Sequence, residues 1–151
     1  MIALLTRLPD WVWLVPTLPL IAVIINGGRV LLGRAQGDAA EPLTARLSEL
    51  SALSGLLLLL AIDLLALLQG APGHLRLGRW FGAGEWEISV SFMLDPLALS
   101  VATLTALIGW LVMRFSANYL HREAGFHRFF IVLAFFLAGI QLVLLGVVDV
   151  V

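Results

Sequence analysis

The sequence predicts an all-α integral membrane protein with four transmembrane helices and an external β-hairpin between the second and third helices. Of its 151 residues, 61% are hydrophobic and only 13% are charged, with a mean hydropathy of +1.03, whereas soluble domains are about one quarter charged. The apolar residues also form four blocks, each close to the roughly 20 residues that a helix needs to cross a bilayer. We therefore expect a single membrane domain over residues 1–151.

The predicted spans cover about residues 11–32, 50–68, 94–115 and 129–148. The first is too long for the apolar region of a secretory signal, so we expect it to be retained. Six of the nine arginines follow the first and third spans, and arginines near helix ends favour the cytoplasmic side. Both termini are therefore predicted to lie outside.

A strand pattern precedes the third span. Residues 85–92 alternate between two faces, with Trp86, Ile88, Val90 and Phe92 on one face and Glu85, Glu87, Ser89 and Ser91 on the other. Such alternation is typical of a half-buried strand. Gly82-Ala83-Gly84 offers a turn before it, so we predict a hairpin over about residues 75–92 that lies over the helix ends.

Asp63 is the candidate proton-path residue. It lies about five residues inside the predicted second span, roughly 8 Å deep at ~1.5 Å per residue, and intramembrane acids usually mark ion paths. The alternative, which stays open, is that the span lies earlier in the chain and leaves Asp63 near the headgroups. Asp95, before Pro96, is expected to cap the third helix rather than to handle ions.

The remaining polar residues suggest no catalytic chemistry. Cysteine is absent, and no spacing predicts a metal ligand set, a catalytic centre, a cofactor site or a nucleic-acid interface. We expect His74, His121 and His127 to be solvated loop residues. Gln141 is expected to form an interhelical hydrogen bond, and Gly109, Gly139 and Gly146 to permit close helix packing.

Three motifs resemble a known family. They are Ser-Phe-Met-Leu-Asp-Pro-Leu-Ala-Leu at residues 91–99, Phe-Ser-Ala-Asn-Tyr-Leu at residues 115–120, and Arg-Phe-Phe at residues 128–130, which follows Glu123 and Gly125. Their order and spacing resemble the N-terminal region of the antiporter-like subunit L (chain 5) of proton-pumping NADH-quinone oxidoreductase, and the related Mrp-antiporter and hydrogenase membrane subunits. The resemblance is strong over residues 80–145 and looser before them.

The resemblance implies a shortened, non-catalytic subunit-L-like membrane protein. It would contribute peripheral N-terminal helices to a proton-translocating complex of a bacterial-type inner membrane, with other membrane subunits, a separate chain supplying the antiporter core, and lipid as partners. The family's conducting glutamate and lysines match no position here. Four residues match family motifs as architectural or interface positions: Asp95, Ser116, Tyr119 and Arg128.

Two alternatives stay open. The chain could be an accessory or assembly protein of a related antiporter-like complex, such as a hydrogenase, an Mrp antiporter or a bicarbonate uptake system. It could also be a small independent four-helix transporter that oligomerises around Asp63.

Overall fold

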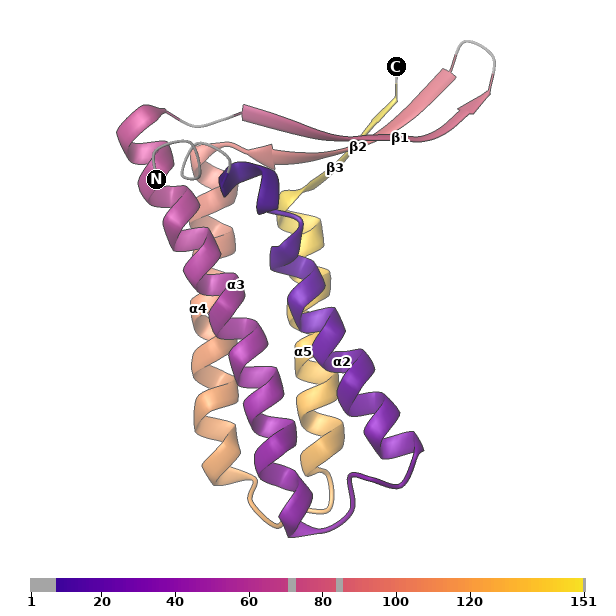
Figure 1. The fold of residues 1–151 in the computed structure, drawn as a ribbon. Coiled ribbons are helices and arrows are strands. Elements are labelled where there is room, and N and C mark those ends of the chain that lie inside the picture. The colour runs from indigo at the N-terminus through magenta and orange to yellow at the C-terminus, as the bar shows by residue number, and fades with distance from the viewer. Residues whose placement is uncertain (1–7, 71–72, 84–85, 151) are drawn as a thin grey trace.

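Four long helices run side by side and carry a small sheet at one end (Figure 1). The computed structural model describes residues 8–70, 73–83 and 86–150. For residues 8, 76–83, 86–88, 90 and 148–150 it describes the backbone only. The helices are α2 (Leu14–Leu31), α3 (Glu41–Gln69), α4 (Pro96–Tyr119) and α5 (Phe126–Leu145). All four are long and apolar enough to cross a membrane. The predicted fold class is confirmed.

Two of the helices extend beyond the apolar blocks of the sequence. α3 has 29 residues and begins at Glu41, nine residues before the predicted span, because residues 41–49 are polar but contain good helix formers such as Ala, Leu, Arg and Glu. α4 continues to Tyr119. Two short 3-10 helices, η1 (Leu8–Trp11) and η2 (Asp38–Ala40), precede α2 and α3.

The sheet confirms the predicted hairpin and adds a third strand. β1 (Gly73–Ala83) pairs antiparallel with β2 (Trp86–Leu94), from Gly73 opposite Leu94 to Ala83 opposite Trp86. β3 (Gly146–Val150) pairs with the other edge of β2. The chain leaves the helical conformation at Gly146, and the valines that follow favour extended structure.

We call the end of the bundle that carries the sheet the sheet end, and the opposite end the loop end (Figure 1). Phe92 of β2 is buried, as predicted, and packs on the sheet-end core with Leu94. Ser91, predicted to face solvent, is also buried, and its hydroxyl donates to the Val147 carbonyl. The prediction was wrong for Ser91 because it did not include β3, which pairs with β2 at this position. The alternation at Trp86, Ile88 and Val90 lies outside the described side chains.

Two apolar clusters fill the bundle. The sheet-end cluster contains Val12, Val15, Leu56, Leu59, Ile62, Phe92, Leu94, Leu99 and Leu145. The loop-end cluster contains Met113, Phe126, Phe130 and Leu137 together with small alanines of α3 and α5. Gly109 of α4 is in close contact with α5, because a Cβ there would lie 2.8 Å from Leu137 Cδ1. Gly139 has open space instead, and Gly146 lies after the end of α5 and begins β3. The packing prediction is therefore confirmed only for Gly109.

Candidate functional site

Asp63 pairs with a hydroxyl of the neighbouring helix. The Thr103 hydroxyl of α4 donates to Asp63 Oδ2 at 2.6 Å, and Asp63 is half-buried. The residue lies six positions before the end of α3 at Gln69, which is roughly 9 Å along the helix axis. The carboxylate thus lies in the half of the bundle nearer the sheet.

A small cavity opens beside this carboxylate. It has a volume of about 230 Å³ and is lined by Asp63, Ala66 and Leu67 of α3 and by Pro96, Leu99 and Ser100 of α4. This space is large enough for several water molecules. The Asp63 carboxylate therefore borders a space that can hold water at the sheet end. Within the described part of the chain, no cluster of three His, Cys, Asp or Glu residues could hold a metal ion.

Gln141 of α5 contacts α4 one residue away from Thr103. Its Nε2 donates to the Ala102 carbonyl at 2.9 Å, which confirms the predicted interhelical hydrogen bond. Gln141 is fully buried. Adjacent residues of α4 therefore carry a polar contact to α3 on one side and to α5 on the other, and together they form a polar layer within the apolar bundle.

A second polar group joins three helices near the loop end. Asn26 of α2 is buried, and its Nδ2 donates to the Ser48 hydroxyl at 3.1 Å and to the Thr44 carbonyl at 3.3 Å. The Arg29 guanidinium donates to the Thr44 hydroxyl at 3.1 Å and to Asn26 Oδ1 at 3.3 Å. Thr44 also contacts His127 Nδ1 of α5 at 2.9 Å. This network links α2, α3 and α5.

The Thr44 hydroxyl restricts the histidine tautomer. Its single proton can go either to the Ala40 carbonyl, at 3.3 Å, or to His127 Nδ1. In the first case His127 must carry its proton on Nδ1, and in the second it must accept there. Either arrangement satisfies the buried hydroxyl.

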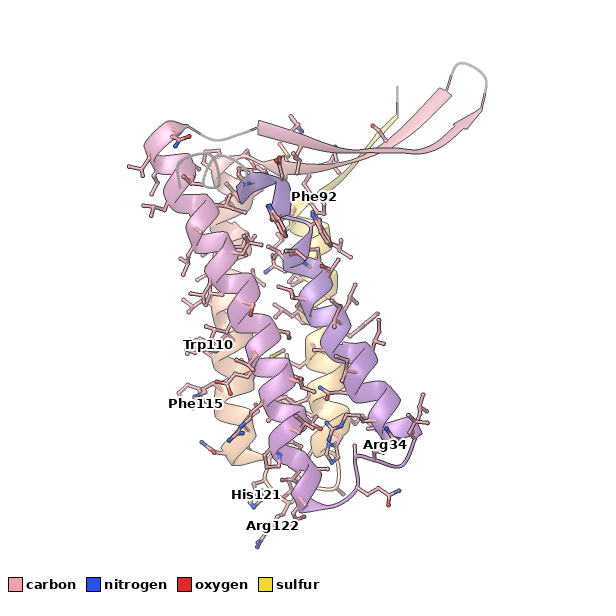
Figure 2. The ribbon with its side chains drawn as sticks, in the orientation of Figure 1. Arg34, Phe92, Trp110, Phe115, His121 and Arg122 are labelled. Atoms are coloured by element: carbon pink, nitrogen blue, oxygen red, sulfur yellow. The ribbon has the colours of Figure 1, made fainter. Side chains whose placement is uncertain are left out.

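Glu41, the first residue of α3, contacts the connection between α4 and α5 at the loop end. The carboxylate is only 5% exposed, contacts His121 Nδ1 at 2.7 Å and accepts from the Arg122 backbone N–H at 3.1 Å. The Arg122 side chain in turn pairs with Asp38 at 3.1 Å. Figure 2 shows His121 and Arg122 at this end of the bundle. These contacts connect the start of α3 to the α4–α5 connection.

The loop-end contacts correct the prediction for two histidines. His127 lies in α5 rather than in a loop and contacts Thr44 of α3. His121 is exposed in the α4–α5 connection, as expected, but it also contacts Glu41 of α3. His74 is exposed. Sequence reasoning missed the pairing because Glu41 and His121 are 80 residues apart. Thr44 and Ser48 share one helix face at a spacing of four residues, and this spacing was a usable signal for the polar network that contains His127.

The four residues that match family motifs do not form one site. The Asp95 carboxylate accepts from Ala98 N at 3.1 Å and caps α4 at the sheet end. Ser116 and Tyr119 line an apolar surface cavity of about 440 Å³ near the loop end of α4, where Tyr119 is 87% exposed. Arg128 is exposed on the first turn of α5.

Comparison with known proteins finds similarity to the same family that the sequence motifs resemble. The family described as "NADH-Ubiquinone oxidoreductase (complex I), chain 5 N-terminus" matches residues 80–130. Subunit 5 of the organellar NAD(P)H-quinone oxidoreductase of Paulinella chromatophora is 26% identical over 144 residues, which cover 95% of this chain and 21% of the relative. The chloroplastic subunit 5 of Chlorokybus atmophyticus is 30% identical over 132 residues, which cover 85% of this chain and 20% of the relative.

The family match covers one complete helix of the bundle. Residues 80–130 contain the end of β1, all of β2, all of α4 and the start of α5. The chain spans about a fifth of the length of these two relatives. Over most of its own length, this multi-pass membrane chain is similar to subunit 5 of NAD(P)H-quinone oxidoreductases, and residues 80–130 match the N-terminal family of that subunit.

Proposed function

We propose that these four helices are a peripheral part of a proton-translocating membrane complex of the NADH-quinone oxidoreductase type. In this proposal they provide packing surfaces for other membrane subunits, among them the chain that carries the antiporter core, and do not themselves conduct protons. The homology to subunit 5 supports the type of complex. Apolar residues separate Asp63 and Thr103 from the polar network at the loop end, and this separation supports the non-conducting role.

That separation is the observation on which the proposal rests. Asp63 contacts Thr103 near the sheet end, while the loop-end network is centred on Thr44 and Ser48. About 15 residues lie between Ser48 and Asp63, or roughly 22 Å along α3, and Leu56 and Leu59 are buried within that length. Proton transfer needs donors and acceptors within hydrogen-bond reach of one another. Residues in an apolar core cannot supply them.

The proposed orientation places the loop end in the cytoplasm and both termini outside a bacterial-type inner membrane. Six of the nine arginines follow the first and third spans, which supports this orientation through the preference of arginine for the cytoplasmic side. α2 and α4 end and α3 begins at the loop end (Figure 1). Arg29, Arg46 and Arg114 lie near these helix ends, and Arg122 follows α4.

Replacing Asp63 by Asn tests the non-conducting role. The amide oxygen can still accept from Thr103, but the side chain no longer binds and releases a proton. We expect assembly and NADH-driven proton uptake by inverted membrane vesicles to stay within twofold of wild type. Asp95→Asn is the matched control, because it also neutralises a carboxylate near the sheet end and keeps a capping side chain.

Normal assembly with strongly reduced proton uptake in Asp63→Asn alone would contradict the proposal. It would favour the second candidate function, in which Asp63 binds protons. The cavity of about 230 Å³ beside Asp63 is the observation that favours this candidate. In an independent four-helix transporter, the same variant would abolish proton flux through vesicles that contain this chain alone.

The hairpin provides a separate test of the packing role. Phe92 and Leu94 close the sheet-end core, so replacing residues 75–92 with a short flexible linker removes the cover of that core. We expect loss of the assembled complex, measured on native gels. An intact complex after this deletion would show that the sheet does not serve as a lid.

A further inference from the structure

The cavity beside Asp63 has polar side chains of one kind only. It has a volume of about 230 Å³ and lies between the last two turns of α3 and the first two turns of α4. Its polar side chains are the Asp63 carboxylate and the Ser100 hydroxyl, and its other lining residues are Ala66, Leu67, Pro96 and Leu99. Both polar side chains offer oxygen atoms, which are the ligands that hard cations prefer.

The hydroxyl groups at this carboxylate have no proton left for a ligand. Ser100 Oγ donates to the Pro96 carbonyl at 2.6 Å, and Thr103 Oγ1 donates to Asp63 Oδ2 at 2.6 Å. A hydroxyl has one proton, so only its lone pairs remain available. Asp63 Oδ1 has no hydrogen-bond partner among the described residues. The polar side chains therefore present acceptors alone, which suit a hydrogen-bond donor or a cation.

The negative charge at the cavity is not compensated. Asp63 has no ion pair among the described residues, and Asp95, which precedes the lining residue Pro96, adds a second carboxylate. The negative end of the α3 dipole and the positive end of the α4 dipole both lie here and offset each other. An unpaired carboxylate in apolar surroundings is costly, whereas its attraction for a cation is strong there. The charge therefore favours a cation over water alone.

The ligand set favours a monovalent cation. Asp63 is the one charged side chain in the cavity lining, and Ser100 adds a neutral oxygen. Divalent cations in proteins are held by several carboxylates or keep most of their water, and the part of the chain that the structure describes has no cluster of three His, Cys, Asp or Glu residues. The cavity is large enough for water molecules to complete the coordination of a small ion.

We propose that this cavity binds a monovalent alkali cation between α3 and α4. The Asp63 carboxylate and Ser100 Oγ are its protein ligands, and Thr103 is a positioning residue that holds the carboxylate through Oδ2. The cation neutralises Asp63 and joins the sheet-end turns of the two helices. The inference requires only the α3–α4 contact, so it does not depend on the proposed role in a proton-translocating complex.

Protection from a carbodiimide tests the proposal. Dicyclohexylcarbodiimide modifies protonated carboxyl groups in apolar surroundings, and a cation that replaces the proton of Asp63 protects it. The protein, purified in the assembly in which it occurs, is treated in sodium chloride or in choline chloride of equal ionic strength, and modification of Asp63 is measured by mass spectrometry. We expect sodium to reduce the modification about fivefold, because the cation and the proton compete for one carboxylate. Choline should not protect, since its methyl groups keep oxygen ligands away from its charge.

A serine variant tests the ligand set. Ser100→Ala removes one ligand and keeps the carboxylate, so we expect the sodium concentration for half-protection to rise about tenfold. Ser54→Ala is the matched control. The Ser54 hydroxyl is also exposed and donates to the carbonyl four residues earlier, but Ser54 does not line the cavity. Its half-protection concentration should equal that of wild type.

Heat stability is a second measurement that does not require modification of Asp63. A ligand that binds the folded state stabilises it. The temperature at which half of the tagged chain remains in solution should be about 2–4 °C higher in sodium chloride than in choline chloride. We expect this difference to vanish in Asp63→Asn.

Three results would overturn the proposal. The first is equal modification of Asp63 in the two salts, which would show that the carboxylate binds protons only. The second is an equal half-protection concentration in Ser100→Ala and Ser54→Ala, which would place the cation outside this cavity. The third is equal heat stability of the wild type in the two salts, which decides the matter also where Asp63 resists the carbodiimide.

Discussion

Replacing Glu41 by alanine tests whether the loop-end contact stabilises the bundle. The buried carboxylate binds two donors, His121 Nδ1 at 2.7 Å and the Arg122 N–H at 3.1 Å. Hydrogen bonds to a charged group contribute about 1.5–3 kcal/mol each. The His121 side chain is 53% exposed, so water replaces most of that contact. Glu41 also lies in the first turn of α3, where a negative charge adds about 0.3–1 kcal/mol.

We therefore expect Glu41→Ala to lower the free energy of unfolding by about 2 kcal/mol. Glu41→Gln keeps an acceptor for Arg122 and should lose about half as much. Glu123→Ala is the matched control, because Glu123 is exposed in the same connection and surface substitutions usually change stability by less than about 0.5 kcal/mol. The assay is SDS titration in mixed micelles, followed by tryptophan fluorescence. Equal stability of Glu41→Ala and Glu123→Ala would show that the buried Glu41 contacts do not stabilise the bundle.

Three further substitutions have expected outcomes in the same assay. Gly109→Val should lower the free energy of unfolding by about 1–3 kcal/mol, because the added side chain overpacks against Leu137. Gly139→Ala should not lower it, because there is open space at its Cβ. An equal loss of stability in both variants would contradict the close packing at Gly109. Asp95→Ala should cost about 1 kcal/mol through loss of the α4 cap, and a neutral result would show that the cap contributes nothing. Asn26→Leu should cost about 1–3 kcal/mol because it leaves buried polar groups of α3 unpaired; unchanged stability would count against the loop-end network.

Local sequence signals predicted much of the fold. Four apolar blocks gave the helices, and alternation before Asp95 gave the hairpin, because both depend on residues adjacent in the chain. The Asp95 cap and the Gln141 hydrogen bond were also accessible, since a capping residue is recognised from its neighbours and a buried amide in an apolar helix needs a partner.

The missed features depend on contacts between distant segments. The apolar run of α5 continues through Val147 and Val148, and a short apolar run does not distinguish a helix from a strand. Only pairing with β2 makes Gly146–Val150 a strand. Similarly, Glu41 near a predicted loop resembles a solvated acid, and its burial follows from the α4–α5 connection, 80 residues away.

In the proposed function, this chain works as a supporting part of a large proton-translocating membrane complex. The most direct test is a native gel of the tagged chain, extracted from its own membranes in mild detergent, with mass spectrometry of the proteins that migrate with it. We expect one large assembly that contains antiporter-like and redox subunits. Migration as a small homo-oligomer of this chain alone would contradict it.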